Sequence, residues 1–212
     1  MNITEAIKNA GHEALLDIQS KCVDAVQSNP ELVLLSKTGS GKTLAFLLSV
    51  LSKMDPNKKN VQGLIIAPTR ELCQQIETVF KSLKSNYKVT LCYGGHPMKI
   101  ERNSLASSPS LIIATPGRLC DHIDRGHIDL ATCHFLVIDE FDKCLEFGFG
   151  EDMSYIARKL TRLRNKLLVS ATNLSEIPDY LQMKNPFEIN ALTTDSDINI
   201  TEYAIEYKND II

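Results

Sequence analysis

Long apolar runs are absent from this sequence. No stretch of its 212 residues approaches the roughly 18 consecutive apolar residues that a membrane span requires. The opening segment, MNITEAIKNAGHEA, also lacks the apolar block of a secretory signal peptide. These two absences argue against a membrane protein and against a secreted one, and they predict a cytoplasmic location.

Cysteine pairs with metal-binding spacing are absent as well. No C-x-x-C pair occurs, and no histidine stands at the spacing of a zinc site. Most of the cysteines have apolar neighbours, which predicts buried thiols in a reducing compartment. The six cysteines lie at positions 22, 73, 92, 120, 133 and 144.

The sequence has no excess of positive charge. It carries 23 Lys and Arg against 26 Asp and Glu, so the formal net charge is −3 and the pI is about 6.0. This balance argues against a broad basic face for nucleic acid, and any such partner must be held locally. Internal repeats and low-complexity blocks are also lacking. With 43% hydrophobic residues, the chain is typical of one globular domain.

Short apolar runs alternate with helical patterns along the chain. The helical segment RELCQQIETVFKSL carries its apolar residues on one face, namely Leu72, Ile76, Val79, Phe80 and Leu83. The alternation predicts an α/β fold, with a mainly parallel sheet covered by helices on both faces. Ligands of such sheets bind beyond the carboxyl ends of the strands. Runs rich in Val, Ile or Leu predict strands at about 32–36, 61–66, 88–92, 110–114, 134–139 and 166–170.

A glycine-rich segment, SKTGSGKT at 36–43, joins the first predicted strand to a helix. Gly39 and Gly41 can turn backbone N–H groups toward phosphate oxygens, while Lys42 supplies a positive charge and Thr43 a hydroxyl for Mg²⁺. The strict phosphate-loop pattern has glycine where Ser36 stands. The position between strand and helix nevertheless favours a phosphate-binding loop. The alternative is a plain helix-capping turn.

Adjacent carboxylates follow the fifth predicted strand, in the segment DEFD at 139–142. Asp139 and Glu140 repel one another, and a cation between them would relieve the repulsion. In an NTPase one such group holds Mg²⁺, and the next orients or deprotonates the attacking water. Alone, such a pair is most often a solvated helix start. Together with the glycine-rich segment it predicts the second half of a nucleotide site.

The set and order of the motifs resemble the DEAD-box family of ATP-dependent RNA helicases over nearly the whole chain. The resemblance implies a RecA-like P-loop NTPase domain. In chain order, the matching residues are Gln19 in LLDIQ, SKTGSGKT, Pro68-Thr69-Arg70-Glu71-Leu72 with Gln75, Gly94-Gly95, Thr115-Pro116-Gly117-Arg118, DEFD continued by Leu145 and Gly148-Phe149, and Ser170-Ala171-Thr172.

The resemblance also implies roles for individual residues. ATP would be bound by the loop residues and by Gln19, which would read the adenine edge through its amide. Thr43 and, through water, Asp139 would hold Mg²⁺, while Glu140 would activate water. Lys42, Asp139 and Glu140 would be the catalytic residues, and Asp142, Ser170 and Thr172 would couple nucleotide state to RNA binding. The ATP-binding loop residues are Thr38, Gly39, Ser40, Gly41, Lys42 and Thr43.

An RNA backbone path is implied by three of the motifs. Contacts to phosphates through a few arginines, backbone N–H groups and helix N-termini are compatible with the acidic pI. Two of these motifs have structural alternatives, because Gly94-Gly95 could be a simple turn and Thr115-Pro116 a helix N-cap. The RNA-contacting residues implied are Pro68, Thr69, Arg70, Gly94, Gly95, Thr115, Pro116, Gly117 and Arg118.

The sequence departs from the family pattern at four positions. Phe141 stands where the acidic motif has alanine, and Ser36 replaces an alanine. Leu15 stands where the Q motif has proline, and Asn2 takes the place of an aromatic residue 17 positions before Gln19. Stacking on the base would therefore be weak or come from elsewhere in the protein.

The domain organisation expected from the resemblance is an amino-terminal half of a helicase. Residues 1–192 would form the RecA-like domain, and 193–212 would be a linker and the start of a second such domain. The fragment would be monomeric and nearly inactive without the arginines of that second domain.

Two other functions fit the motifs less well: a nucleotide-responsive RNA-binding or adaptor module without turnover, and a DNA translocase of the same superfamily. Retention of Glu140 favours the enzyme.

Overall fold

The computed structural model describes residues 3–174 and 176–192. The predicted linker and second-domain start at 193–212, and Asn2, lie outside these residues. All six cysteines lie within them. They are free, five are buried and Cys120 is partly exposed, which confirms the prediction of buried thiols. No helix in the described ranges is long and apolar enough to cross a membrane.

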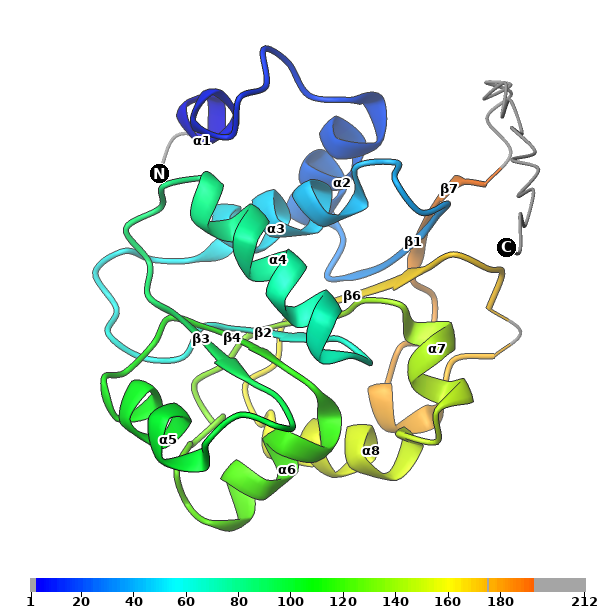
Figure 1. The fold of residues 1–212 in the computed structure, drawn as a ribbon. Coiled ribbons are helices and arrows are strands. Elements are labelled where there is room, and N and C mark those ends of the chain that lie inside the picture. Colours follow the sequence, from blue (N-terminus) through cyan, green and yellow to red (C-terminus); the bar gives the residue numbers. More distant parts are fainter. Residues whose placement is uncertain (1–2, 175, 193–212) are drawn as a thin grey trace, which may run out of the picture.

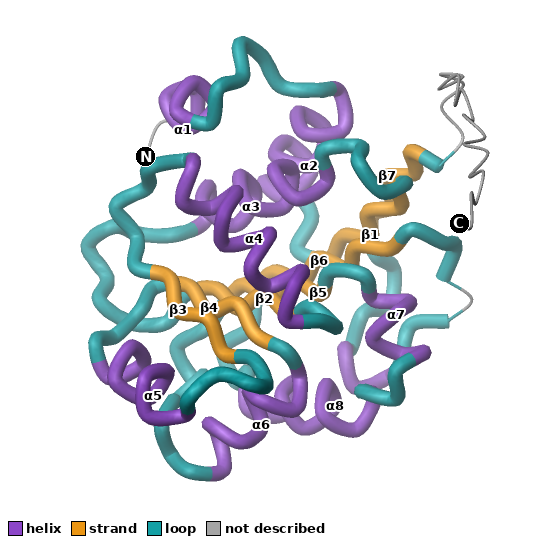
Figure 2. The backbone as a smooth tube through the Cα atoms, in the orientation of Figure 1, coloured by secondary structure: helices purple, strands orange, loops and turns teal. Residues whose placement is uncertain are grey.

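A single parallel sheet of seven strands forms the centre of the described chain (Figure 2). Its order is β3-β4-β2-β5-β6-β1-β7, and every strand pair runs in parallel. The six predicted strands are confirmed, and β7 is an additional edge strand. The strands are β1 (Glu31–Ser36), β2 (Gly63–Ile66), β3 (Val89–Cys92), β4 (Leu111–Ala114), β5 (Phe135–Ile138), β6 (Asn165–Ser170) and β7 (Phe187–Ala191).

Helices cover both faces of the sheet, as predicted (Figure 1). The first four helices pack on one face, and α5 to α8 pack on the other. The helices are α1 (Ile3–Asn9), α2 (Asp17–Ser28), α3 (Lys42–Lys53), α4 (Arg70–Ser82), α5 (Met98–Ala106), α6 (Pro116–Asp124), α7 (Phe141–Glu146) and α8 (Gly150–Lys159), with a short 3₁₀ helix η1 (Asp179–Leu181).

Two hydrophobic cores result from the alternation of side chains along each strand. In β1, Leu32 and Leu34 join the core beneath α1 to α4, whereas Val33 and Leu35 join the core beneath α5 to α8. Both faces of the strand are therefore buried, which explains why the strands are continuous apolar runs in the sequence.

The apolar face predicted for the helix at 70–83 is confirmed in α4. Ile76, Phe80 and Leu83 are buried, while Leu72 and Val79 pack against the same core. This anchoring fixes the start of α4 at Arg70, directly beyond the carboxyl end of β2.

Candidate nucleotide and RNA site

The strand order divides the predicted site residues into two adjoining groups. Strands β5, β6 and β1 are neighbours, so DEFD, Ser170-Ala171-Thr172 and the loop at 36–43 meet at one half of the carboxyl edge. Strands β3, β4 and β2 are neighbours in the other half. Their carboxyl ends bring together Gly94-Gly95, Thr115 to Arg118, and Pro68 to Arg70. One edge of the sheet thus presents both sets of motifs side by side.

The loop between β1 and α3 turns through two glycines in the left-handed region. Gly39 has φ +81° and Gly41 has φ +85°. Ser36 lies fully buried at the end of β1, and its hydroxyl is hydrogen-bonded to that of Ser40 within the loop. The serine that departs from the family pattern is therefore accommodated by a contact inside the loop itself. Thr38 is exposed, and Thr43 is half-buried in the first turn of α3.

Gln19 in α2 connects the amino-terminal segment to this loop. Its Nε2 donates to the Gly41 carbonyl at 3.2 Å, and its Oε1 accepts from the Leu16 N–H at 2.9 Å. The side chain is only 4% exposed. The structure therefore places Gln19 beside the phosphate loop with both ends of its amide on backbone groups, and adenine reading stays a prediction.

Two buried polar atoms of opposite charge lack partners among the described residues. Lys42 Nζ, at the start of α3, and Asp139 Oδ2, just after β5, are both shielded from solvent and make no hydrogen bond. Leaving buried polar groups unpaired is costly, so such atoms indicate a missing ligand. A phosphate oxygen would satisfy the lysine, and a hydrated divalent cation would satisfy the carboxylate. The residues present therefore fit a Mg²⁺-nucleotide.

The electrostatics of Asp139 follow from its position. Burial raises its pKa to about 6; the Lys42 ammonium acts against this rise, and the carboxylates of Glu140 and Asp142 add to it. Its Oδ1 accepts from the Glu140 N–H at 3.0 Å. Glu140 has φ +47°, a left-handed conformation uncommon for a residue other than glycine. Asp139 is fully buried, whereas Glu140 is partly exposed.

The residues predicted to couple the two halves of the site contact one another. The Thr172 hydroxyl donates to Asp142 Oδ2 at 2.8 Å, which joins the loop after β6 to α7. Ser170 is buried, and its hydroxyl accepts from the Thr172 N–H at 3.1 Å and donates to the Thr172 carbonyl at 2.7 Å. The three residues therefore form one connected unit beside Asp139, through the side chain and the backbone of Thr172.

The predicted RNA residues open the helices that follow β2 and β4. Thr69 caps α4 by accepting from the Leu72 N–H at 3.2 Å, and Pro116 is the first residue of α6, after Thr115. Arg70 is exposed, and its guanidinium lies near Gly95, since a Cβ on that glycine would be 3.7 Å from it. Helix starts, a glycine turn and an exposed arginine thus lie together.

A direct contact with an RNA phosphate would require an exposed Arg118, but the structure places this side chain in a mostly buried position. Its side chain is 13% exposed. Nε donates to the Tyr93 carbonyl at 3.1 Å, and a terminal nitrogen donates to the His96 carbonyl at 2.7 Å. These carbonyls flank Gly94-Gly95, so Arg118 ties α6 to that loop. Glu101 and His122, which sequence motifs do not mark, lie in the same network.

Comparison with known proteins identifies relatives of the same class. A sequence model of the DEAD/DEAH box helicase family matches residues 16–179. The chain is 35% identical over 211 residues to the ATP-dependent RNA helicase DeaD of Escherichia coli (strain K12), covering 96% of the chain and 34% of the relative. It is 33% identical over 210 residues to the DEAD-box ATP-dependent RNA helicase CshA of Bacillus licheniformis, covering 97% and 43%.

A solved structure shares the fold. A DEAD box protein from the hyperthermophile Methanococcus jannaschii matches with a TM-score of 0.81 and 33% sequence identity, over 90% of this chain and 53% of that one. The match confirms the predicted RecA-like α/β class. The chain therefore belongs to the DEAD/DEAH box helicase family. It spans about a third to two-fifths of the length of the curated relatives that it matches.

Proposed function

We propose that this chain is the nucleotide- and RNA-binding domain of an ATP-dependent RNA helicase. The observation that carries the proposal is the pair of buried, unpartnered atoms, Lys42 Nζ and Asp139 Oδ2, at the edge of the sheet where ligands of this fold bind. The relatives named as ATP-dependent RNA helicases support ATP as the nucleotide.

The proposed nucleotide site assigns one task to each group. The backbone of the loop from Thr38 to Gly41 and the Lys42 ammonium hold the phosphates. The Thr43 hydroxyl binds Mg²⁺, and Asp139 holds it through water. When bound, Mg²⁺ supplies charge neutralisation at the phosphates. Glu140 accepts a proton from the attacking water, since it directly follows Asp139 and is partly exposed.

The proposed RNA site uses the other half of the edge. Pro68 to Arg70, Gly94-Gly95 and Thr115 to Gly117 offer backbone N–H groups, helix starts and one exposed cation to the sugar-phosphate backbone. Asp142, Ser170 and Thr172 connect this half to the nucleotide, because they contact one another beside Asp139. Such contacts give affinity with little sequence preference.

A second RecA-like domain and a cytoplasmic location complete the proposal. The curated relatives contain more than half of their length outside the match, which supports a further domain acting with this one. Free thiols at all six cysteines are compatible with a reducing compartment.

The nucleotide site can be tested by calorimetric titration of the 212-residue chain with Mg²⁺-ATP. We expect Lys42→Ala to lose roughly tenfold or more in affinity, because a charge-assisted hydrogen bond to phosphate is lost. Glu140→Gln should keep the affinity within about twofold, because the proposed base acts on water and holds no part of the nucleotide.

The matched control is Lys53→Ala, which removes a lysine from the other end of α3. Its nucleotide affinity should equal that of the unaltered chain. Equal affinities for the Lys42 and Lys53 variants would contradict the phosphate-binding role of Lys42. An equal loss in the Lys42 and Glu140 variants would contradict the role of Glu140.

A further inference from the structure

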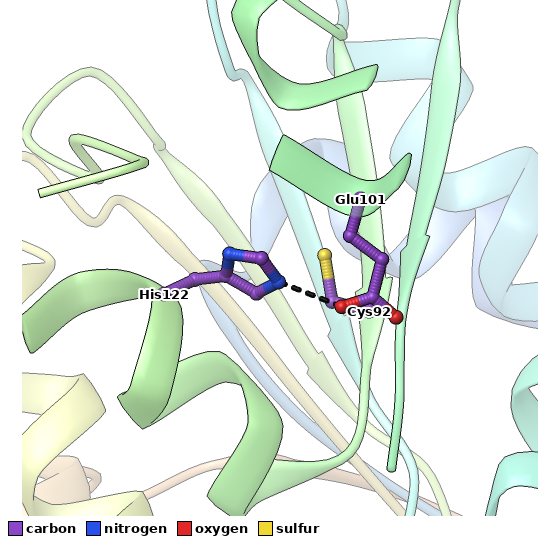
Figure 3. Close-up of side chains that lie close together, drawn as sticks. All are labelled: Cys92, Glu101 and His122. Carbon is purple, nitrogen blue, oxygen red and sulfur yellow. Dashed lines mark hydrogen bonds and ion pairs between the residues drawn. The ribbon is translucent and has the colours of Figure 1, made fainter. Parts of the chain in front are cut away.

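A buried carboxylate outside the nucleotide site joins the segments that we assign to RNA. Glu101 lies in α5 and is only 1% exposed. Its side chain points toward His122 of α6 and lies beside Cys92, at the end of β3 (Figure 3). Elements that are distant in sequence therefore meet at this one side chain.

The hydrogen bonds of Glu101 connect the Gly94-Gly95 loop to α6. Oε1 accepts from the Tyr93 N–H at 3.1 Å, immediately before the two glycines. Oε2 lies 2.7 Å from His122 Nε2 and 3.5 Å from Arg118 Nε. Because a carboxylate only accepts, His122 Nε2 carries the hydrogen of that bond.

Arg118 completes the connection from the other side. It donates to the carbonyls of Tyr93 and His96, on either side of the two glycines. Glu101 holds an N–H of this loop, and Arg118 holds its carbonyls. The two side chains also attract one another. The loop is thus fixed to α6 by a single polar network, through Arg118 near the start of the helix and His122 in its last turn.

The same residues could be considered as a cation site, since one ligand atom each from Cys92, Glu101 and His122 lie within 4.8 Å of one another. Three observations argue against it. Burial, followed by the nearby Glu101 carboxylate, raises the pKa of the Cys92 thiol, which disfavours the thiolate that a metal requires. The Arg118 guanidinium lies beside the Glu101 oxygen that would bind the cation. Both carboxylate oxygens already accept hydrogen bonds.

We propose that Glu101 is a positioning residue for RNA, which holds Gly94-Gly95 and the start of α6 in the relative arrangement that binds consecutive phosphates. This inference rests on the proposed function. Backbone N–H groups bind phosphate well only when their directions are fixed beforehand. Neither glycine restrains its own backbone, and a Cβ at Gly94 would contact nothing. The restraint therefore comes from Glu101 and Arg118.

Removal of the carboxylate leaves its partners without compensation. The Tyr93 N–H and the Arg118 guanidinium would lose an acceptor in a partly buried place, which favours rearrangement of the loop. The nucleotide half of the edge shares none of these contacts. Loss of RNA affinity with retained nucleotide affinity is therefore the signature of this role, and general destabilisation would not produce it.

The experiment compares Glu101→Ala, Glu101→Gln and the control Glu31→Gln in the 212-residue chain. Glu31 also forms a partly buried ion pair, with Lys166 at 2.8 Å, but it lies at the amino end of β1, the opposite edge of the sheet. Three quantities are measured: hydrogen exchange of the Tyr93 amide in the free protein, affinity for a single-stranded oligouridylate by NMR titration, and affinity for Mg²⁺-ATP.

We expect Glu101→Ala to speed exchange at Tyr93 and to weaken RNA binding roughly tenfold, with nucleotide affinity unchanged. Glu101→Gln keeps one carbonyl acceptor, so it should recover part of the RNA affinity. Glu31→Gln should leave RNA affinity unaltered. Retained RNA affinity in a folded Glu101→Ala chain, or an equal loss of nucleotide affinity, would overturn the positioning role. Absence of RNA binding by the unaltered chain would instead overturn the proposed function.

Discussion

The backbone conformation favours glycine at positions 39 and 41, and limited space favours it at position 41 as well. Both residues have φ in the left-handed region, which costs about 1–2 kcal/mol for a residue with a Cβ. A Cβ at Gly39 would meet nothing within 4 Å, but at Gly41 it would lie 2.6 Å from Gln19 Nε2. Position 41 therefore also needs space for the Gln19 side chain.

We predict that Gly41→Ala destabilises the chain more than Gly39→Ala does. Gly39→Ala should lower the free energy of unfolding by about 1–2 kcal/mol, the cost of a left-handed backbone for a residue with a Cβ. Gly41→Ala should cost roughly 1 kcal/mol more, because Gln19 must move and lose its bond to the Gly41 carbonyl. Urea denaturation of the two variants measures the difference. Equal losses would show that the contact between Gln19 and the loop contributes nothing to stability.

Individual site residues were predictable where local sequence carries the signal. Lys42 and Asp139 stand in short motifs at strand ends, and the structure buries both without partners. Glu101 and His122 carry no such signal, because they are 21 positions apart and meet only through packing of α5 and α6. Arg118 was predicted to line the RNA path, but its contacts are with carbonyls of the protein.

At the scale of elements, α2 is linked to the phosphate loop through one side chain. Gln19 contacts the Leu16 N–H and the Gly41 carbonyl, so the start of α2 and the start of α3 are held together. This geometry offers a role for Gln19 that does not involve a base, beside the adenine-reading role implied by the family resemblance.

The two roles of Gln19 predict different results for Gln19→Ala. If the residue positions the loop, affinity for ATP, GTP and inorganic triphosphate should fall by a similar factor, roughly fivefold to tenfold for one lost hydrogen-bonding side chain. If it reads adenine, the loss should be confined to ATP. The contacts in the free chain lead us to expect a loss for all three ligands, measured by calorimetry with Mg²⁺ present. Unchanged triphosphate affinity would rule out the loop-positioning role.

The elements themselves were predictable to the extent that they are buried. Six strands are apolar runs because both faces of the sheet are covered, and each was predicted within a few residues. Strand β7 was missed because it is an edge strand in which only Ile189 is buried, while Phe187 is 48% exposed. Phe141, a departure from the family pattern, is fully buried in the core beneath α5 to α8.

On the scale of the whole molecule, one sheet edge explains how an acidic domain could hold both ATP and RNA. The net charge of −3 offers no general attraction for phosphates. Single positive groups nevertheless stand where loops and helix starts meet, with Lys42 in one half of the edge and Arg70 in the other. Thr172 and Asp142 join the loop after β6 to α7.

Whether every group needed for ATP hydrolysis is present is also a property of the whole molecule. The chain contains the loop, the proposed metal carboxylate and the proposed base, whereas its relatives extend far beyond the matched region. Arginines supplied from outside a nucleotide site are typically worth about 10³–10⁵ in rate. We therefore expect the 212-residue chain to bind Mg²⁺-ATP yet release phosphate very slowly, with little stimulation by RNA. Steady-state phosphate release with and without oligouridylate, with Glu140→Gln as the blank, measures this. Robust RNA-stimulated release, abolished in the blank, would show that the chain holds a complete catalytic site.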